Sequence, residues 1–79
     1  MKYRKKPVII DAVLFDGNNF KECEEFLCGN FDNTLNYPNI RTLNGIVSID
    51  VGEYICKGVK GEFYPCDPII FGLTYEVVE

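Results

Sequence analysis

One stretch near the start of the chain constrains the fold more than any other feature of the sequence. Residues 7–15 read PVIIDAVLF, a run of β-branched and other apolar residues interrupted only by Asp11. Such near-continuous apolarity is typical of a strand that is covered, at least in part, on both faces. In a chain of 79 residues, 47% of them hydrophobic, this strand predicts a single domain over residues 1–79.

One helix is predicted after that strand, over residues 19–27. Asn19 can cap it, and Glu22 stands three residues later, as in a capping box. Gly29 is a natural stop for the same helix. Its apolar residues recur at helical spacing, which predicts a stripe that packs on the core, and they are Phe20, Cys23, Phe26 and Leu27.

The second half of the chain reads as a loop over residues 30–39 followed by short strands. Asn44-Gly45 predicts a two-residue hairpin turn. Asp67 followed by Pro68 predicts a cap and the start of a single helical turn. The predicted strands cover residues 41–43, 46–50, 54–57, 62–64 (ended by Pro65) and 74–78. The fold class is therefore α+β: one helix packed on a small twisted antiparallel sheet, whose strands are short enough to curl toward an open barrel.

The chemistry-bearing residues do not predict an enzyme. The chain has no His, which excludes Ser-His and Cys-His nucleophile pairs. Four cysteines could in principle bind zinc, but Cys23 and Cys28 lie about 500° apart around one helix, a poor arrangement for shared ligation. We therefore expect buried free thiols at Cys23, Cys28, Cys56 and Cys66. No catalytic residue, metal site or cofactor is predicted.

Membrane association is not predicted either. No apolar run approaches the roughly 18 residues of a membrane span, and the basic start leads into a strand pattern without a cleavage site, unlike a signal peptide. We expect a reducing compartment, in which disulfides are rare. A chain this short often gains stability by self-association, so a homo-oligomer is expected.

Charge is divided unevenly along the chain. The first six residues carry four of the eight basic side chains, and the rest, with four basic and twelve acidic residues, carries −8. The lysines can be interpreted as solubilising guards of sheet edges or as part of an anion pocket. A long nucleic acid is disfavoured because the acidic remainder would repel it.

The segment over residues 57–66, KGVKGEFYPC, is the richest candidate site. Two glycines let the backbone approach a ligand, and backbone N–H groups in such a turn can form an anion nest. Lys57 and Lys60 flank them, and Tyr64 could stack on a base. The alternative interpretation is an ordinary hairpin turn with Phe63 in the core.

Two stretches resemble a family of small proteins common in tailed bacteriophage and prophage genomes. The resemblance rests on the basic KYRKKP start, on Gly52-Glu53-Tyr54-Ile55, on the run KGVKGEFYPC, and on a P-x-I-F…T-Y-E tail. It covers slightly more than half the chain and leaves out residues 18–39. It implies a protein that works in the cytoplasm of a bacterial host.

By analogy with small phage proteins that counter host defence, we expect a non-enzymatic sponge that sequesters an anionic nucleotide immune signal. The expected ligand-binding residues are Tyr3, Arg4, Lys5, Lys6, Lys57, Gly58, Lys60, Gly61 and Tyr64. This site requires the basic start and the glycine turn to be neighbours. One alternative is a protein-interaction module that inhibits a host factor through an acidic face (Glu22, Glu24, Glu25, Asp32). Another is a virion accessory protein.

Overall fold

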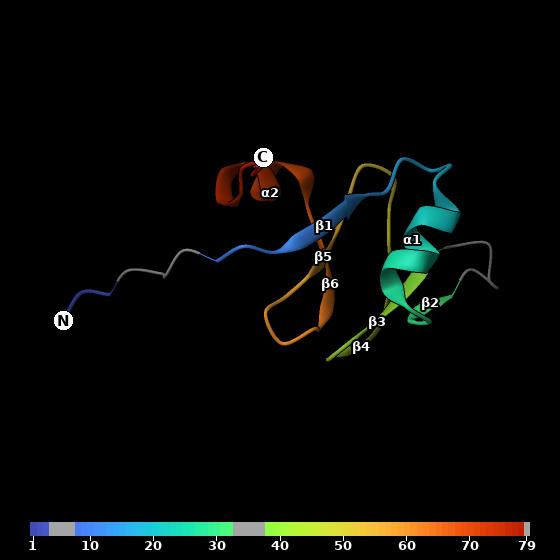
Figure 1. Cartoon of the computed structure of the whole chain (residues 1–79), viewed down its shortest axis with the longest axis horizontal. Helices are drawn as coiled ribbons and strands as arrows, with labels where there is room; N and C mark the ends of the chain where they lie inside the picture. Colours follow the sequence, from blue (N-terminus) through green and yellow to red (C-terminus); the bar gives the residue numbers. More distant parts are fainter. Residues whose placement is uncertain (4–7, 33–37, 79) are drawn as a thin grey trace.

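The computed structural model describes residues 1–3, 8–32 and 38–78. Figure 1 shows the helices and short strands of the body, with residues 1–3 lying away from it. In chain order the elements are β1 (Asp11–Leu14), α1 (Phe20–Leu27), β2 (Phe31–Asp32), β3 (Asn39–Thr42), β4 (Gly45–Ser48), β5 (Tyr54–Lys57), β6 (Phe63–Cys66) and α2 (Pro68–Thr74). The predicted α+β class is confirmed.

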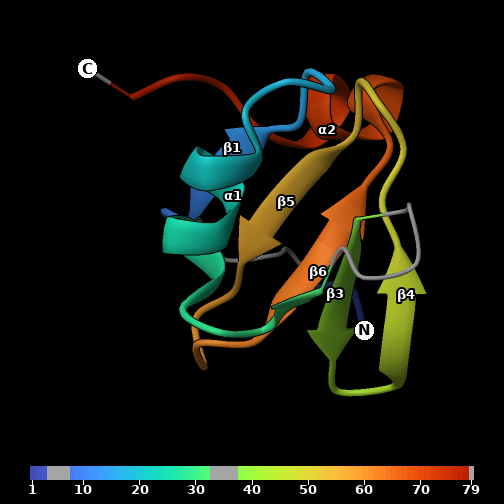
Figure 2. The ribbon, with the colours of Figure 1, turned by 90° about the vertical axis from the view of Figure 1, so that its right-hand side faces the viewer.

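The described strands form two antiparallel three-stranded sheets, ordered β1-β5-β6 and β2-β3-β4. Figure 2 shows β5 between β1 and β6, with the second sheet beside β6. No hydrogen-bond ladder closes these described strands into a barrel. The two sheets share one core, and its buried residues are Phe15, Cys23, Leu27, Ile40, Ile49, Ile55 and Phe63.

Helix α1 forms as the sequence predicts, but its ends are built differently. The Asn19 side chain donates to the Leu14 carbonyl and the Glu22 carboxylate, both at 2.7 Å, and caps no backbone N–H of the helix. At the other end Cys28 takes a left-handed conformation with φ 50°, ahead of Gly29 at φ 92°. The stop therefore falls one residue earlier than Gly29.

The hairpin between β3 and β4 is confirmed, with its turn shifted by one residue. Thr42 pairs with Gly45, so the two connecting residues are Leu43 and Asn44. Neither has a positive φ, whereas Gly45 has φ 110°. The turn is therefore not of the type that needs a positive φ at both connecting residues. Instead, Gly45, the residue directly after the turn, has the positive φ.

Several predicted strand boundaries are wrong. The first strand is only Asp11–Leu14, the segment over residues 30–39 that was predicted as a loop contains β2 and the first residue of β3, and β3 and β4 each begin earlier than predicted. Pro65 does not end β6 but pairs with Ile55 inside it, which is tolerated because β6 is an edge strand and needs no outward N–H. The closing strand predicted over residues 74–78 is absent, since α2 continues to Thr74 and residues 75–78 belong to no helix or strand. The predicted single helical turn is thus a second, seven-residue helix.

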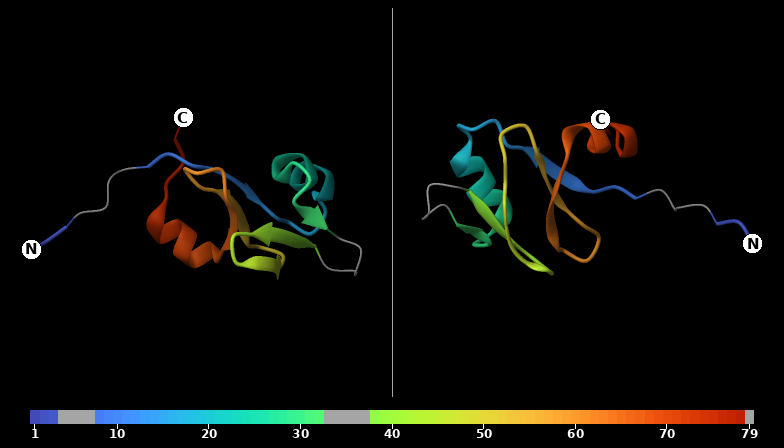
Figure 3. Two further views of the ribbon diagram at one scale, coloured as in Figure 1. Left: turned by 90° about the horizontal axis from the view of Figure 1, so that it is seen from below. Right: turned by 180° about the vertical axis from the view of Figure 1, so that it is seen from behind.

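The sheet β1-β5-β6 has two different faces because side chains alternate along each strand. Ile55 and Phe63 point into the core on the side of α1. On the opposite face, Tyr54 stacks on Phe71 of α2 with ring centroids 3.8 Å apart. Figures 1 and 3 show α1 and α2 at opposite ends of the body. Only one face of this sheet therefore belongs to the main core.

Candidate functional site

The glycine turn joins β5 to β6, and its own carboxylate occupies it. Gly58 N–H donates to the Glu62 carbonyl at 2.7 Å, and Gly61 N–H donates to the Gly58 carbonyl at 3.0 Å. The Glu62 carboxylate accepts the Lys60 N–H at 3.1 Å and lies so close to Gly58 that a Cβ there would overlap it. The turn can hold an anion, and in this structure that anion is Glu62.

The two lysines of the turn are exposed. Lys57 places its Nζ 5.9 Å from the centroid of the Phe63 ring, and that ring is buried in the core, as the alternative interpretation of this segment expects. Gly61 has φ 82°, a conformation that favours glycine. Lys57, Gly58, Lys60 and Gly61 thus lie together in one turn.

Tyr64 lies on the other face of the sheet from Phe63. Its hydroxyl is 3.4 Å from the Tyr75 hydroxyl, and this hydrogen bond, together with burial, raises the pKa of Tyr64. A groove of about 320 Å³ lies between β6 and the β3–β4 hairpin, and its lining includes Tyr64, Thr42, Asn44 and Glu62. Because Glu62 belongs to both, this groove adjoins the turn.

The N-terminal part of the predicted site does not join this turn. Arg4, Lys5 and Lys6 lie outside the described residues, so their predicted role stays a prediction. Tyr3 is 88% exposed, and the N-terminal end of the chain lies well away from the β5–β6 turn in Figure 1. Residues 1–3 and the glycine turn are therefore separate surfaces in this conformation.

A second surface, which the sequence analysis did not single out, surrounds α2. None of the residues of α2 is buried, and Ile69 and Leu73, one helical turn apart, are 73% and 84% exposed. Ile70 beside them is also exposed. These three side chains, hereafter the α2 outer face, carry no charge. The sequence feature that could have indicated this surface is the run PIIFGLT, which contains no charged residue.

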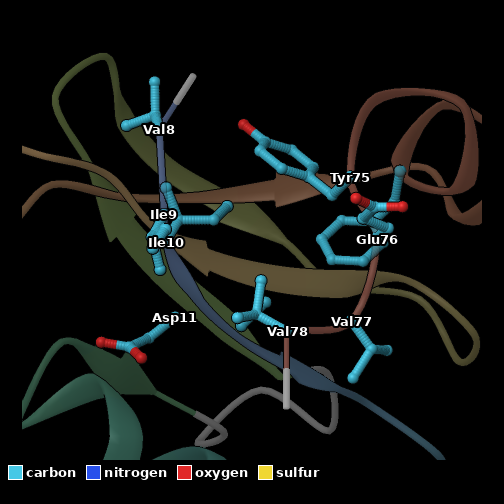
Figure 4. Close-up of a pocket in the computed structure, with 10 residues that line it drawn as sticks. Val8, Ile9, Ile10, Asp11, Tyr75, Glu76, Val77 and Val78 are labelled. Atoms are coloured by element: carbon cyan, nitrogen blue, oxygen red, sulfur yellow. The ribbon is translucent and has the colours of Figure 1, made fainter.

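Beside α2 runs a groove of about 410 Å³. One wall is the extended segment from Val8 to Ala12, and the other comes from Phe71 and the chain that follows α2. Figure 4 shows Val8, Ile9 and Ile10 along one side and Tyr75, Glu76, Val77 and Val78 along the other. The lining is mostly aliphatic and aromatic, which suits an apolar side chain better than a phosphate.

The cysteines are free thiols. Burial raises the pKa of Cys23 and that of Cys56, the latter to about 12, and burial with the nearby Asp67 charge raises the pKa of Cys66. Cys28 is exposed. Within the part of the chain that the structure describes, no three His, Cys, Asp or Glu residues are grouped so as to hold a metal ion.

Comparisons with protein-family models, with curated proteins and with solved structures find no match to this chain. Among the described residues, no helix has the length and apolarity needed to cross a membrane.

Proposed function

We propose that the chain is a small non-enzymatic protein-interaction module that binds its partner through the α2 outer face. The observation that carries this proposal is the exposure of Ile69, Ile70 and Leu73 on one helix. Apolar side chains clustered at the surface of a small domain commonly mark a binding site for another protein. Three such residues at helical spacing fit an apolar groove on a partner.

The helix is held in place by its opposite side, which leaves the outer face available. Phe71 stacks on Tyr54 with an interplanar angle of 8° and contacts the Tyr75 ring at a centroid distance of 5.1 Å. The Asp67 side chain fixes the first turn by accepting the N–H groups of Ile69 and Ile70. These contacts anchor one side of the helix to the sheet, and a helix that is already formed loses less conformational freedom on binding, which favours affinity.

The non-enzymatic part of the proposal is supported by the state of the thiols. The reactive form of cysteine is the thiolate. Because burial raises the pKa of Cys23, Cys56 and Cys66, these thiols stay protonated at neutral pH. They are therefore poorly suited to act as nucleophiles.

The resemblance to tailed-phage proteins suggests where the partner would be found. We propose a protein of the bacterial host cytoplasm, bound and inhibited by this chain during infection. The acidic body of the chain, at −4 overall, would steer association toward a basic partner. This context comes from the resemblance and not from the site geometry.

The test is retention of a host protein by immobilised variants in bacterial lysate. Replacing Ile69 and Leu73 by Lys should abolish retention of a protein that the wild type retains. The matched control replaces Ile46 and Val59, exposed apolar residues outside α2, by Lys and changes the net charge equally. Equal retention by both double variants would contradict the proposed surface.

A second candidate function, sequestration of a nucleotide, is favoured by the glycine turn. The turn already binds a carboxylate through the Lys60 N–H, its two lysines are exposed, and Tyr64 is among the residues that line the adjoining groove. A phosphate could take the place of Glu62 if that side chain swung out. The oligomeric sponge expected from the sequence would use this turn without the N-terminal residues.

Native mass spectrometry with cyclic and ADP-ribose-type nucleotides tests this candidate. Glu62→Gln should raise affinity about fivefold, because removing one unit charge near the ligand is worth about 1 kcal/mol in a water-like dielectric. Lys57→Ala with Lys60→Ala should lower it. Unchanged binding in both variants would remove the turn from consideration.

A further inference from the structure

The outer edge of β1 and the segment before it form an unpaired apolar strand edge. We propose that two copies of the chain associate by pairing these edges, Val8 to Ala12, antiparallel about a two-fold axis at Ile10. The pairing would join two sheets into one continuous sheet through β1. The paired residues are distinct from those of the α2 outer face.

The hydrogen-bond pattern shows which backbone groups face outward. The Phe15 N–H donates to the Glu53 carbonyl, and the Phe15 carbonyl accepts the Gly52 N–H. Because backbone groups alternate in direction along a strand, the N–H and C=O groups of Val13 and Asp11 also point toward β5. The groups of Ala12 and Leu14 then point away from β5. The Leu14 carbonyl confirms this direction, because it accepts the Asn19 amide at 2.7 Å on that side.

The segment before β1 extends this edge past the end of its neighbour. β5 ends at Lys57, opposite Asp11, and the chain then turns away at Gly58. Val8, Ile9 and Ile10 consequently make no hydrogen bond to any residue that the structure describes. Continuing the alternation along the extended segment, Val8 and Ile10 present their N–H and C=O to the same outer side as Ala12.

The segment before β1 exposes apolar side chains to solvent. Ile9 is 79% exposed, although the segment has the composition of a strand covered on both faces. An exposed apolar edge strand invites pairing with another chain. A second copy supplies an identical strand, and a two-fold axis lets both edges pair at once without leaving a free apolar edge.

Charge and capping select the register. With Ile10 opposite Ile10 of the partner, Asp11 faces Ile9 of the partner, and Val8 faces Ala12. An axis at Asp11 would set two like charges directly opposite, which is destabilising. An axis at Ala12 would require the Leu14 carbonyl, which Asn19 already occupies.

The same register brings opposite charges together. In an antiparallel pairing, the chain that follows the partner's Ala12, which leads to Asp16 and the start of α1, lies on the N-terminal side of Val8. Lys2, Asp16 and Glu22 are all exposed. Half of the basic residues precede Val8, and the remainder of the chain carries −8, so a second copy is electrostatically complementary to this end.

Two proline variants, compared by sedimentation velocity, test the pairing. Ile10→Pro removes an N–H that the pairing uses, whereas Ile9→Pro removes one that faces the side of β5 and is used by neither strand. The wild type and Ile9→Pro should sediment as dimers, and Ile10→Pro as a monomer. A monomeric wild type, or an Ile10→Pro variant as dimeric as Ile9→Pro, would overturn the proposal.

Disulfide cross-linking tests the register even if a proline variant fails to fold. In a Cys28→Ser background, Ile10→Cys should form a dimer on mild oxidation, because facing residues of a hydrogen-bonded pair lie about 5.5 Å apart, within disulfide reach. Ile9→Cys should not, since the two positions would lie about 8 Å apart from strand spacing and rise. Equal cross-linking of both variants would exclude this register.

Discussion

Cys56 shows how one side chain couples the sheet to pH. Its side chain lies between β1 and β6 on the α2 side of β5, where it is fully buried. Burial, reinforced by the neighbouring Cys66, raises the pKa of its thiol from 9.0 to about 12. The folded state therefore holds the proton more tightly than the unfolded chain does.

This difference predicts a loss of stability in alkali. Below pH 9 both states keep the proton, and the contribution of Cys56 is fully present. As pH rises from 9 toward 12 the unfolded chain releases the proton first, so the free energy of unfolding falls by roughly 1 kcal/mol per pH unit. The stability gap between wild type and Cys56→Ala, measured by urea unfolding, should narrow from pH ~8 to pH ~10.5. A gap that stays constant would contradict the buried, protonated thiol.

At the scale of single elements, α2 depends on its first residue outside the helix. The Asp67 carboxylate accepts the Ile69 N–H at 2.8 Å and the Ile70 N–H at 3.3 Å. Asp67→Ala should lower the free energy of unfolding by about 1 kcal/mol, the usual cost of losing an N-cap. Asp67→Asn keeps an acceptor of the same shape and should change it much less. Equal losses in both variants would show that the cap is not what stabilises α2.

The sequence predicts elements well where local chemistry determines them. The pattern of residues 54–57 gives β5 without error, and Asp67 with Pro68 correctly marks the start of α2. The errors have tertiary causes. Pro65 is tolerated in β6 because that strand lies at the edge of its sheet. The apolar residues after Pro68 form a longer helix than predicted, which is stabilised where the Phe71 ring stacks on the Tyr54 ring.

The candidate site was only partly predictable for the same reason. Adjacent residues such as Lys57 and Lys60 necessarily share the glycine turn, so that group could be read from the chain. The Glu62 side chain folds back onto the turn. This contact depends on the rotamer of Glu62, which no sequence pattern encodes. The α2 outer face was missed because the segment after Asp67 was predicted as a single helical turn, with no burial assigned to it. Only the three-dimensional packing shows that Ile69, Ile70 and Leu73 stay exposed.

At the scale of the whole molecule, the two proposed contacts lie away from the main core. The structure measures 47 × 25 × 20 Å, and its core lies toward α1, while α2 and the groove beside it lie at the other end (Figure 3). The two proposed contacts, the α2 outer face and the edge of β1, are both on that half. A dimer through β1 would therefore present two copies of α2 to its partners.

In-cell photocrosslinking is the measurement that tests the central claim most directly. A benzophenone amino acid would replace Leu73 in the α2 outer face, and in a control chain it would replace Val59, which is similarly exposed in the glycine turn. After irradiation in bacteria, we predict a covalent adduct to one host protein from position 73 and none from position 59. An absence of adducts from position 73, or the same adducts from both positions, would contradict the assignment of α2 as the binding surface.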